Sequence, residues 1–208
     1  MKLTSKSLKN GARIGDDYAF GVPDPEKHMT FGGNRNPHLA WDKLPHATRS
    51  LAVICVDKDV PSVGDDVNQE GKTIPADLPR VDFFHWVMID VPPEFDHIEE
   101  ANCSDGVVEG GKRKPPGPKG SRQGLNDYSQ FMAGSDLAGD YHGYDGPCPP
   151  WNDERLHHYH FRVYALDVER LEVGDHFDGR DVMAAIAGHV LDSAELTGTY
   201  TLNPAVMG

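Results

Sequence analysis

The sequence contains little cysteine and no long apolar run, and both shortages exclude whole classes of protein. Its three cysteines, Cys55, Cys103 and Cys148, are odd in number and lack the Cys-x-x-Cys spacing of zinc or redox sites, so we expect reduced thiols. No window approaches the roughly 18 apolar residues of a membrane-spanning helix. Residues 1–6 are basic but no apolar stretch follows them, which argues against a secretory signal and favours a cytoplasmic protein.

Basic residues are also scarce. The 208 residues include 20 Lys and Arg against 33 Asp and Glu, which gives a formal net charge of −13. A field of this sign repels nucleic acid and anionic membrane surfaces, so we expect neither as a partner. The one basic cluster, residues 112–114 with Lys119 and Arg122 nearby, lies in a stretch rich in Pro and Gly and is interpreted as a solvated loop.

The hydrophobic patterns predict a mainly β protein. Residues 50–56 and 83–89 are short, nearly unbroken apolar runs, typical of strands covered on both faces. Residues 159–166 alternate as a half-buried strand does, and residues 195–202 read as a closing strand. Helical spacing occurs over residues 181–189, near the C-terminus, where we expect His189 to be buried.

Together these patterns predict one domain over residues 1–208. Runs of strands without alternating βαβ units favour an antiparallel β-sandwich with a few peripheral helices. Two stretches rich in Gly, Pro, Asp and Asn, near residues 62–80 and 101–142, are interpreted as long loop insertions.

Polar residues follow the predicted strands at points where a pocket would form. The candidate ligand-binding residues are Asp57, Asp59, His85, Gly146, Cys148, Pro149, Pro150, His157 and Tyr159. We expect the Asp57 carboxylate to accept a proton from one ring nitrogen of His85, favouring an imidazolium whose other nitrogen faces an anion.

The remaining candidate residues add donors and rigidity to this pocket. His157 and Tyr159, two apart on a strand, point the same way and add an imidazole and a phenol. Gly146 and Cys148 offer backbone N–H donors, while Pro149 and Pro150 stiffen the loop. The pattern predicts a site for a phosphate-sized anion.

Several alternatives stay open at this stage. Asp59 serves equally well as a turn cap, and the loop around Cys148 as a stiff turn between strands. His158 and His160 lie on the opposite strand face from His157, so we expect no metal site, and nothing indicates a cofactor. A low-activity hydrolase or lyase would combine Cys148 with Asp57, His85 and His157. Since no helix N-terminus follows Cys148 to activate its thiol, we favour a binding protein without enzymatic activity.

The order of these motifs resembles the phosphatidylethanolamine-binding protein family, which includes the Raf kinase inhibitor proteins and their bacterial and archaeal relatives. The resemblance is carried by Asp57-Lys58-Asp59-Val60-Pro61, His85, Gly146-Pro147-Cys148-Pro149-Pro150 and His157-His158-Tyr159, and also by residues 32–41, 48–52, 188–191 and 194–200. Lys58 and His158 depart from the family, which has proline and arginine at these positions.

The resemblance has implications for fold and function. It implies a Greek-key β-sandwich and the binding of a small anion or phospholipid headgroup. It also implies a regulatory role, including inhibition of a kinase or another enzyme as protein partner, and it is compatible with a homodimer.

Overall fold

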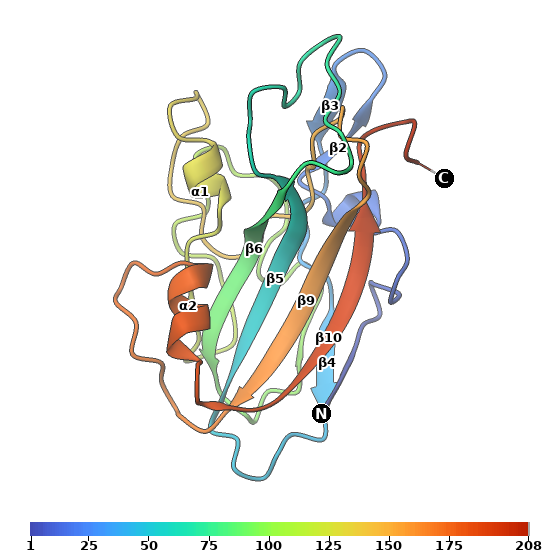
Figure 1. The fold of residues 1–208 in the computed structure, drawn as a ribbon. Coiled ribbons are helices and arrows are strands. Elements are labelled where there is room, and N and C mark those ends of the chain that lie inside the picture. Colours follow the sequence, from blue (N-terminus) through green and yellow to red (C-terminus); the bar gives the residue numbers. More distant parts are fainter. Residues whose placement is uncertain (208) are drawn as a thin grey trace.

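The protein is built on a five-stranded antiparallel sheet, seen in a computed structural model that describes residues 1–207 (Figure 1). The strand order is β10-β9-β5-β6-β8. The bounds are β5 Ser50–Pro61, β6 Arg80–Val91, β8 Arg122–Gln123, β9 His157–Leu166 and β10 Val190–Tyr200. The apolar runs at residues 50–56 and 83–89 occupy the middle of the sheet, which explains why they do not alternate: both of their faces are covered.

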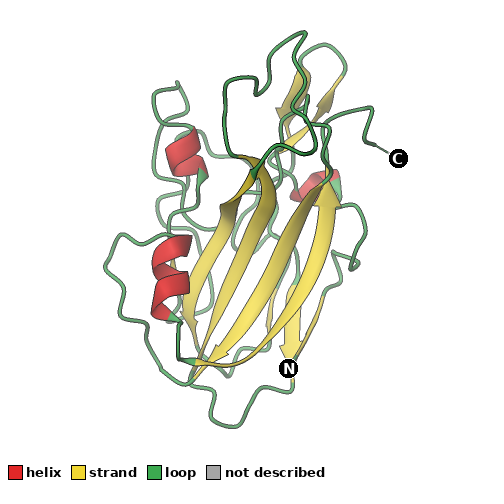
Figure 2. Ribbon diagram, in the orientation of Figure 1, coloured by secondary structure: helices red, strands yellow, loops and turns green. Residues whose placement is uncertain are grey.

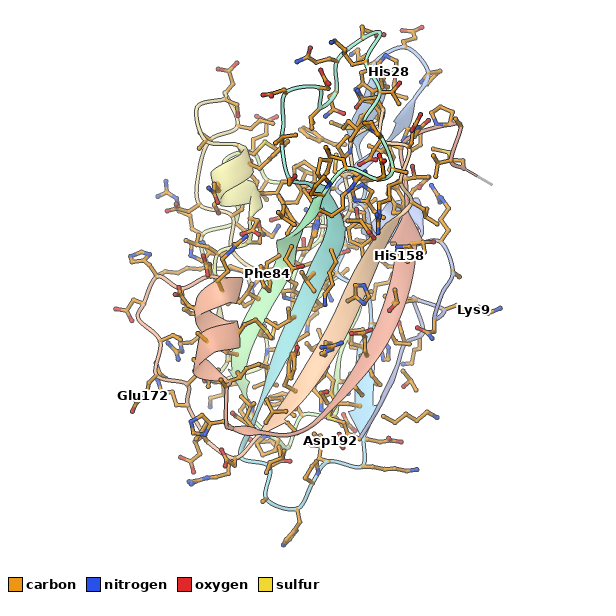
Figure 3. All side chains as sticks on the ribbon, in the orientation of Figure 1. Lys9, His28, Phe84, His158, Glu172 and Asp192 are labelled. Atoms are coloured by element: carbon orange, nitrogen blue, oxygen red, sulfur yellow. The ribbon has the colours of Figure 1, made fainter. Side chains whose placement is uncertain are left out.

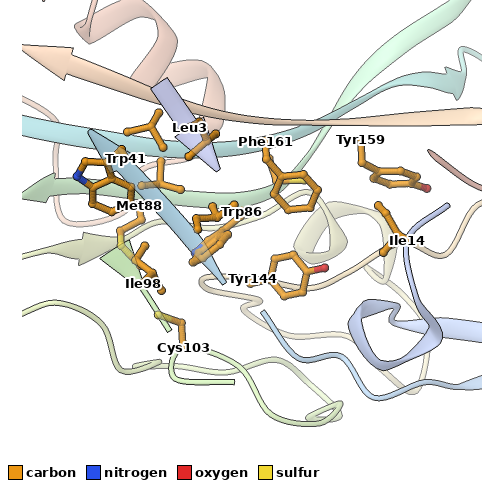
Figure 4. Close-up of a cluster of buried hydrophobic side chains, with 14 of the residues drawn as sticks. Leu3, Ile14, Trp41, Trp86, Met88, Ile98, Cys103, Tyr144, Tyr159 and Phe161 are labelled. Atoms are coloured by element: carbon orange, nitrogen blue, oxygen red, sulfur yellow. The ribbon is translucent and has the colours of Figure 1, made fainter. Parts of the chain in front are cut away.

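A smaller sheet covers one face of the main sheet. It consists of β1 (Lys2–Thr4), β4 (Leu39–Asp42) and β7 (His97–Ile98), and a hairpin of β2 (Gly21–Asp24) and β3 (His28–Phe31) lies beyond it. Side chains of the two sheets meet in a core that includes Trp41, Trp86 and Phe161 (Figure 4). The predicted antiparallel β-sandwich is therefore confirmed.

The second face of the main sheet is covered by α2 (Gly179–Ala185) and the segment before it. Asp178 caps this helix by accepting hydrogen bonds from the backbone N–H groups of Arg180 and Asp181. Phe84 of β6 lies next to α2 (Figure 3), and a Cβ placed on Gly179 would come within 2.2 Å of its ring. The other helical segments are short: a 3₁₀ turn η1 (Asp16–Tyr18) and α1 (Tyr128–Phe131) (Figure 2).

Two predicted boundaries are wrong at the C-terminus. The helix ends at Ala185, short of His189, because the chain turns at Gly188 with a φ of 85° that favours glycine. His189 is consequently half-exposed and bonded to Asp167, not buried. The closing strand starts earlier than expected, at Val190, and ends at Tyr200.

A long loop covers the end of the main sheet where β5 ends and β6 begins, and a second long loop runs beside β6. Residues 62–79 connect β5 to β6, and residues 99–156 run between β7 and β9 with β8 and α1 inside them. The three cysteines are free thiols. Within residues 1–207, no helix has the length and apolarity required to cross a bilayer.

Candidate functional site

A pocket with a volume of about 160 Å³ lies where β5, β6 and β9 reach the loop-covered end of the sheet. His158 marks this end of β9 in Figure 3. Its lining combines a small polar group of residues with a larger apolar wall: Asp57, His85, His157 and Tyr159 on one side, and Val60, Pro61, Gly64, Val67, Asn68, Phe83, Tyr128, Phe131, Cys148, Pro149 and Pro150 around them. Seven of the nine residues expected from the sequence therefore lie together around one pocket.

Sheet register brings the polar side chains together. Asp57 pairs with Phe83 on β6 and with Tyr159 on β9. His85 lies two residues beyond Phe83, and His157 two residues before Tyr159, so alternation turns all of these side chains toward the same face. A bulge in β5 between Asp57 and Val60 ends the regular pairing at this point, where the strand bends into the pocket loop.

Asp57 is bonded to His157 and not to His85, contrary to the sequence expectation. The His157 Nδ1 atom lies 2.6 Å from Asp57 Oδ2, and its Nε2 atom lies 3.0 Å from Asp153 Oδ2. Burial would lower the pKa of His157, but the charges of Asp57 and Asp153 and their hydrogen bonds raise it to about 9. The imidazolium of the site is therefore His157.

Asp153 completes this buried charge network. Arg80 binds its two carboxylate oxygens at 2.5 and 3.1 Å. Burial acts to raise the pKa of Asp153, but hydrogen bonds from His157, Arg80 and the Arg155 N–H outweigh it and hold that pKa below its usual value. Sequence reasoning missed both Asp153 and Arg80. The only sequence feature that could have indicated the contact between Asp153 and His157 is their separation of four residues.

His85 has a different partner and a different charge state from those expected. Its Nδ1 atom donates to the backbone carbonyl of Asp145 at 2.8 Å. Burial lowers the pKa of His85 despite the neighbouring Asp57 carboxylate, so the ring is neutral at pH 7. The expected imidazolium at His85 is therefore wrong, because the ring is buried without an ionic bond of its own.

Tyr159 brings an unpartnered hydroxyl to the pocket. The residue is fully buried, and among residues 1–207 its hydroxyl makes no hydrogen bond of good geometry, although the Asp57 carboxylate lies near it. Burial raises the pKa of Tyr159 well above its usual value, so the hydroxyl keeps its proton and remains a donor. A buried donor without an acceptor costs about 1 to 3 kcal/mol, and a ligand oxygen would remove that cost.

Asp59 and Gly146 lie outside the pocket lining. Asp59 accepts hydrogen bonds from Arg155 Nε at 2.6 Å and from both the N–H and the Nδ1 of His158, so it ties β5 to β9. The Gly146 N–H, expected to face a ligand, donates to Asn34 Oδ1 at 2.8 Å. A glycine fits there because a Cβ would lie 2.0 Å from the Tyr18 carbonyl oxygen.

The remaining loop residues form the wall of the pocket. Cys148, Pro149 and Pro150 line it, and burial raises the pKa of the Cys148 thiol to about 12. The aromatic side chains Phe83, Tyr128 and Phe131 close the other side, with Phe83 and Tyr128 packed edge to face at 5.2 Å between ring centroids. Tyr128 and Phe131 fall inside the stretch interpreted as an insertion. Its composition gave no indication that a short helix there would place these two side chains in the pocket wall.

The pocket residues offer no arrangement for a metal ion. Within residues 1–207, no group of three or more His, Cys, Asp or Glu side chains is placed to hold one. His160, near the crowded histidines of β9, is bonded to Glu195 on the opposite sheet face.

The protein is thus a two-sheet β protein with a small, partly polar cavity at one end of the main sheet. Residues 4–201 match the model of the family described as phosphatidylethanolamine-binding protein. This chain belongs to that family, which confirms the resemblance read from the sequence.

Relatives come from archaea and bacteria. A UPF0098 protein of Methanothermobacter thermautotrophicus is 36% identical over 177 residues, which cover 85% of this chain and 89% of the relative. The UPF0098 protein YbhB of Escherichia coli is 28% identical over 201 residues, covering 97% and 100%. The crystal structure of Escherichia coli YbcL, described as a member of the mammalian PEBP family, superposes with a TM-score of 0.68 at 27% identity, covering 96% of this chain and 97% of YbcL.

Proposed function

We propose that this protein binds a small phosphate-like anion, of the kind carried by phospholipid headgroups, in the pocket between Asp57, His85 and Tyr159. The observation that carries the proposal is the Tyr159 hydroxyl, a buried donor with no partner among residues 1–207, in the lining of the cavity. A cavity of about 160 Å³ holds several waters, at roughly 30 Å³ each in the liquid, or one small tetrahedral anion with its substituent. Family membership supports the same ligand class.

The side-chain chemistry of the pocket supports binding over catalysis. A nucleophilic cysteine needs a lowered pKa, whereas burial raises that of Cys148 to about 12. His157, the imidazole that could activate it, has both ring nitrogens bonded to carboxylates. The hydrolase or lyase alternative therefore lacks an ionised nucleophile, and His157 cannot serve as its base, so we propose that the site is not an enzyme active site.

An NMR titration with inorganic phosphate tests this proposal. Amide shift changes should centre on Asp57, His85, Cys148 and Tyr159. Tyr159→Phe should weaken phosphate binding about tenfold or more, since a hydrogen bond to a charged group contributes about 1.5 to 3 kcal/mol. Tyr164→Phe is the matched control: Tyr164 lies on the same strand, packs in the core on the other face of the sheet and should leave affinity unchanged. Shift changes confined to another surface would refute the proposal.

A further inference from the structure

The loop between β5 and β6 (Figure 1) brings a carboxamide with unused donors to the pocket. Asn68 of this loop lines the pocket together with Gly64 and Val67. Its Oδ1 atom accepts from the Trp151 backbone N–H at 3.0 Å. Because a backbone N–H can only donate, the atom that faces it must be the oxygen, which fixes the orientation of the carboxamide. Within residues 1–207 no hydrogen bond involves Asn68 Nδ2, so both of its hydrogens remain available.

The backbone of Asn68 is fixed as well. Its N–H donates to Asn152 Oδ1 at 3.0 Å. Its φ of 56° lies in the left-handed region, which asparagine adopts more readily than most residues. One main-chain bond and one side-chain bond therefore join Asn68 to the two residues that follow Pro150 in the pocket wall. The carboxamide is preorganised, which lowers the entropic cost of using it to bind a ligand.

Asn152 holds the tip of the same loop, residues 64–72, against the pocket. This side chain is buried, and its Nδ2 lies 2.8 Å from the Asp66 carbonyl oxygen, 3.1 Å from that of Lys72 and 3.4 Å from that of Gln69. Its backbone carbonyl accepts from the Ile74 N–H at 3.0 Å. A single buried carboxamide thus gathers three carbonyl groups and one N–H of the tip, counting its bond to Asn68.

Few other contacts restrain the tip. Within residues 1–207, its hydrogen bonds and ion pairs outside the loop are those with Asn152 and Trp151 and one between Glu70 and His28. The Glu70 contact is exposed to solvent, so it contributes little. The base of the loop is held separately, because Arg80 donates to the Pro75 carbonyl at 2.7 Å. The tip can therefore move away from the pocket while the base stays in place, and Asn152 is the residue that prevents it.

From this geometry we infer that the loop tip closes over the bound anion, that Asn68 Nδ2 donates to one of its phosphoryl oxygens, and that Asn152 is the positioning residue that keeps the tip closed. This inference rests on the proposed function and adds a second donor to the Tyr159 hydroxyl. The two donors come from different elements, the rigid strand β9 and a loop. A phosphoryl group with two unesterified oxygens can accept from both at once, and phosphate, its monoesters and its diesters share this feature.

Two substitutions of Asn68 test the donor. Asn68→Asp keeps the oxygen that accepts from the Trp151 N–H and replaces the donor by an anionic oxygen. Asn68→Gly removes the donor without adding charge, and glycine adopts the positive φ of this position freely. Both variants should therefore keep the fold of the loop backbone. The probes are inorganic phosphate and short-chain dihexanoyl phosphatidylethanolamine, which represent the free anion and the lipid headgroup.

Calorimetry at neutral pH gives the affinities. The Kd of both probes should rise about tenfold in Asn68→Gly and about tenfold or more in Asn68→Asp, the effect of losing one hydrogen bond to a charged group. The factor should be the same for phosphate and for the lipid, because the lost bond is to the oxygens that they share. Asn10→Asp is the matched control: Asn10 is exposed, lies outside the pocket lining and accepts from the Thr197 N–H at 2.9 Å. It adds the same charge and should leave both affinities unchanged.

The role of Asn152 is tested through rates and coupling. In Asn152→Ala, amide hydrogen exchange should accelerate over residues 66–74 and stay slow in the central strands, since only the tip is released. Phosphate dissociation, measured by NMR line shapes, should accelerate about tenfold with little change in the association rate. In this background Asn68→Gly should cost about threefold or less, because an open tip no longer presents the donor. The Asn68 variants test the donor even if Asn152→Ala fails to fold.

The outcomes separate this inference from the function beneath it. Unchanged phosphate affinity in Asn68→Gly, with shift changes still centred on Asp57 and Tyr159, overturns the inference and leaves anion binding intact. A loss confined to one of the two probes overturns it as well, and so does a full, additive effect of Asn68→Gly in the Asn152→Ala background. If neither probe shifts the pocket residues of the unmodified protein, the proposed function fails and this inference fails with it.

Discussion

Asp57 and His157 form a buried ion pair across two neighbouring strands, with 2.6 Å between Oδ2 and Nδ1. They are 100 residues apart in the chain, yet β5 and β9 pair so that Asp57 lies opposite Tyr159, two residues beyond His157. Asp153 and Arg80 extend the pair into a row of four alternating charges. The site is thus built on a neutralised ionic network, and the neutral side chains of His85 and Tyr159 line the pocket beside it.

Removing His157 should strongly destabilise the fold. His157→Gln leaves Asp57 and Asp153 buried without their shared cation, and breaking a buried charge pair costs about 3 to 5 kcal/mol. Urea unfolding followed by tryptophan fluorescence measures the change. His160→Gln is the control on the same strand: His160 is partly exposed and bonded to Glu195, so its loss should cost about 1 kcal/mol or less. Equal losses for the two variants would contradict the buried network.

Stability should fall as pH rises from about 6.5 to 9. The pKa of His157 is raised from 6.5 to about 9 in the folded state, so over this interval the folded protein holds a proton that the unfolded chain has released. The contribution is complete below pH 6.5 and is lost as pH passes through about 9, with a total on the order of 3 kcal/mol. Urea midpoints measured across this range should show the decline, and His157→Gln should flatten it. A slope that persists unchanged in that variant would assign the effect to other groups.

Removing the hydroxyl should change stability in opposite directions at two of the buried tyrosines, Tyr159 and Tyr144. Tyr159→Phe removes a buried donor without a partner, so stability should stay equal or rise by about 1 kcal/mol. Tyr144→Phe removes a hydrogen bond of 2.6 Å to the Tyr18 carbonyl and should lower stability by about 1 to 2 kcal/mol. Thermal and urea unfolding of the two variants check the contrast. A clear loss for Tyr159→Phe would mean that its hydroxyl is bonded in the folded protein.

Cys148 should react slowly with iodoacetamide. Burial raises the pKa of its thiol from 9.0 to about 12, which lowers the thiolate fraction at neutral pH about 1000-fold. Mass spectrometry of the folded protein at pH 7.5 should show little alkylation over a time in which the urea-unfolded protein is fully labelled. Rapid labelling of Cys148 that phosphate suppresses would instead support the hydrolase or lyase alternative.

The sequence by itself determined the central strands, the family and seven of the fifteen residues that line the pocket. Apolar runs at residues 50–56 and 83–89 are a local signal, and they became the central strands β5 and β6. The motif residues Asp57, His85, Cys148, Pro149, Pro150, His157 and Tyr159 could be placed together because each follows or starts a recognisable strand or turn.

Only the tertiary structure decided which side chains form hydrogen bonds and ion pairs with one another. From the sequence, either His85 or His157 could have paired with Asp57. In the structure the strand register brings His157 to Asp57, while the ring of His85 binds the Asp145 carbonyl and stays neutral. Tyr128 and Phe131 reach the pocket from a four-residue helix that carries no periodic signal of its own. Hydrogen bonds and pKa values depend on distances of a few ångströms and on burial between segments far apart in the chain, and local sequence patterns contain neither.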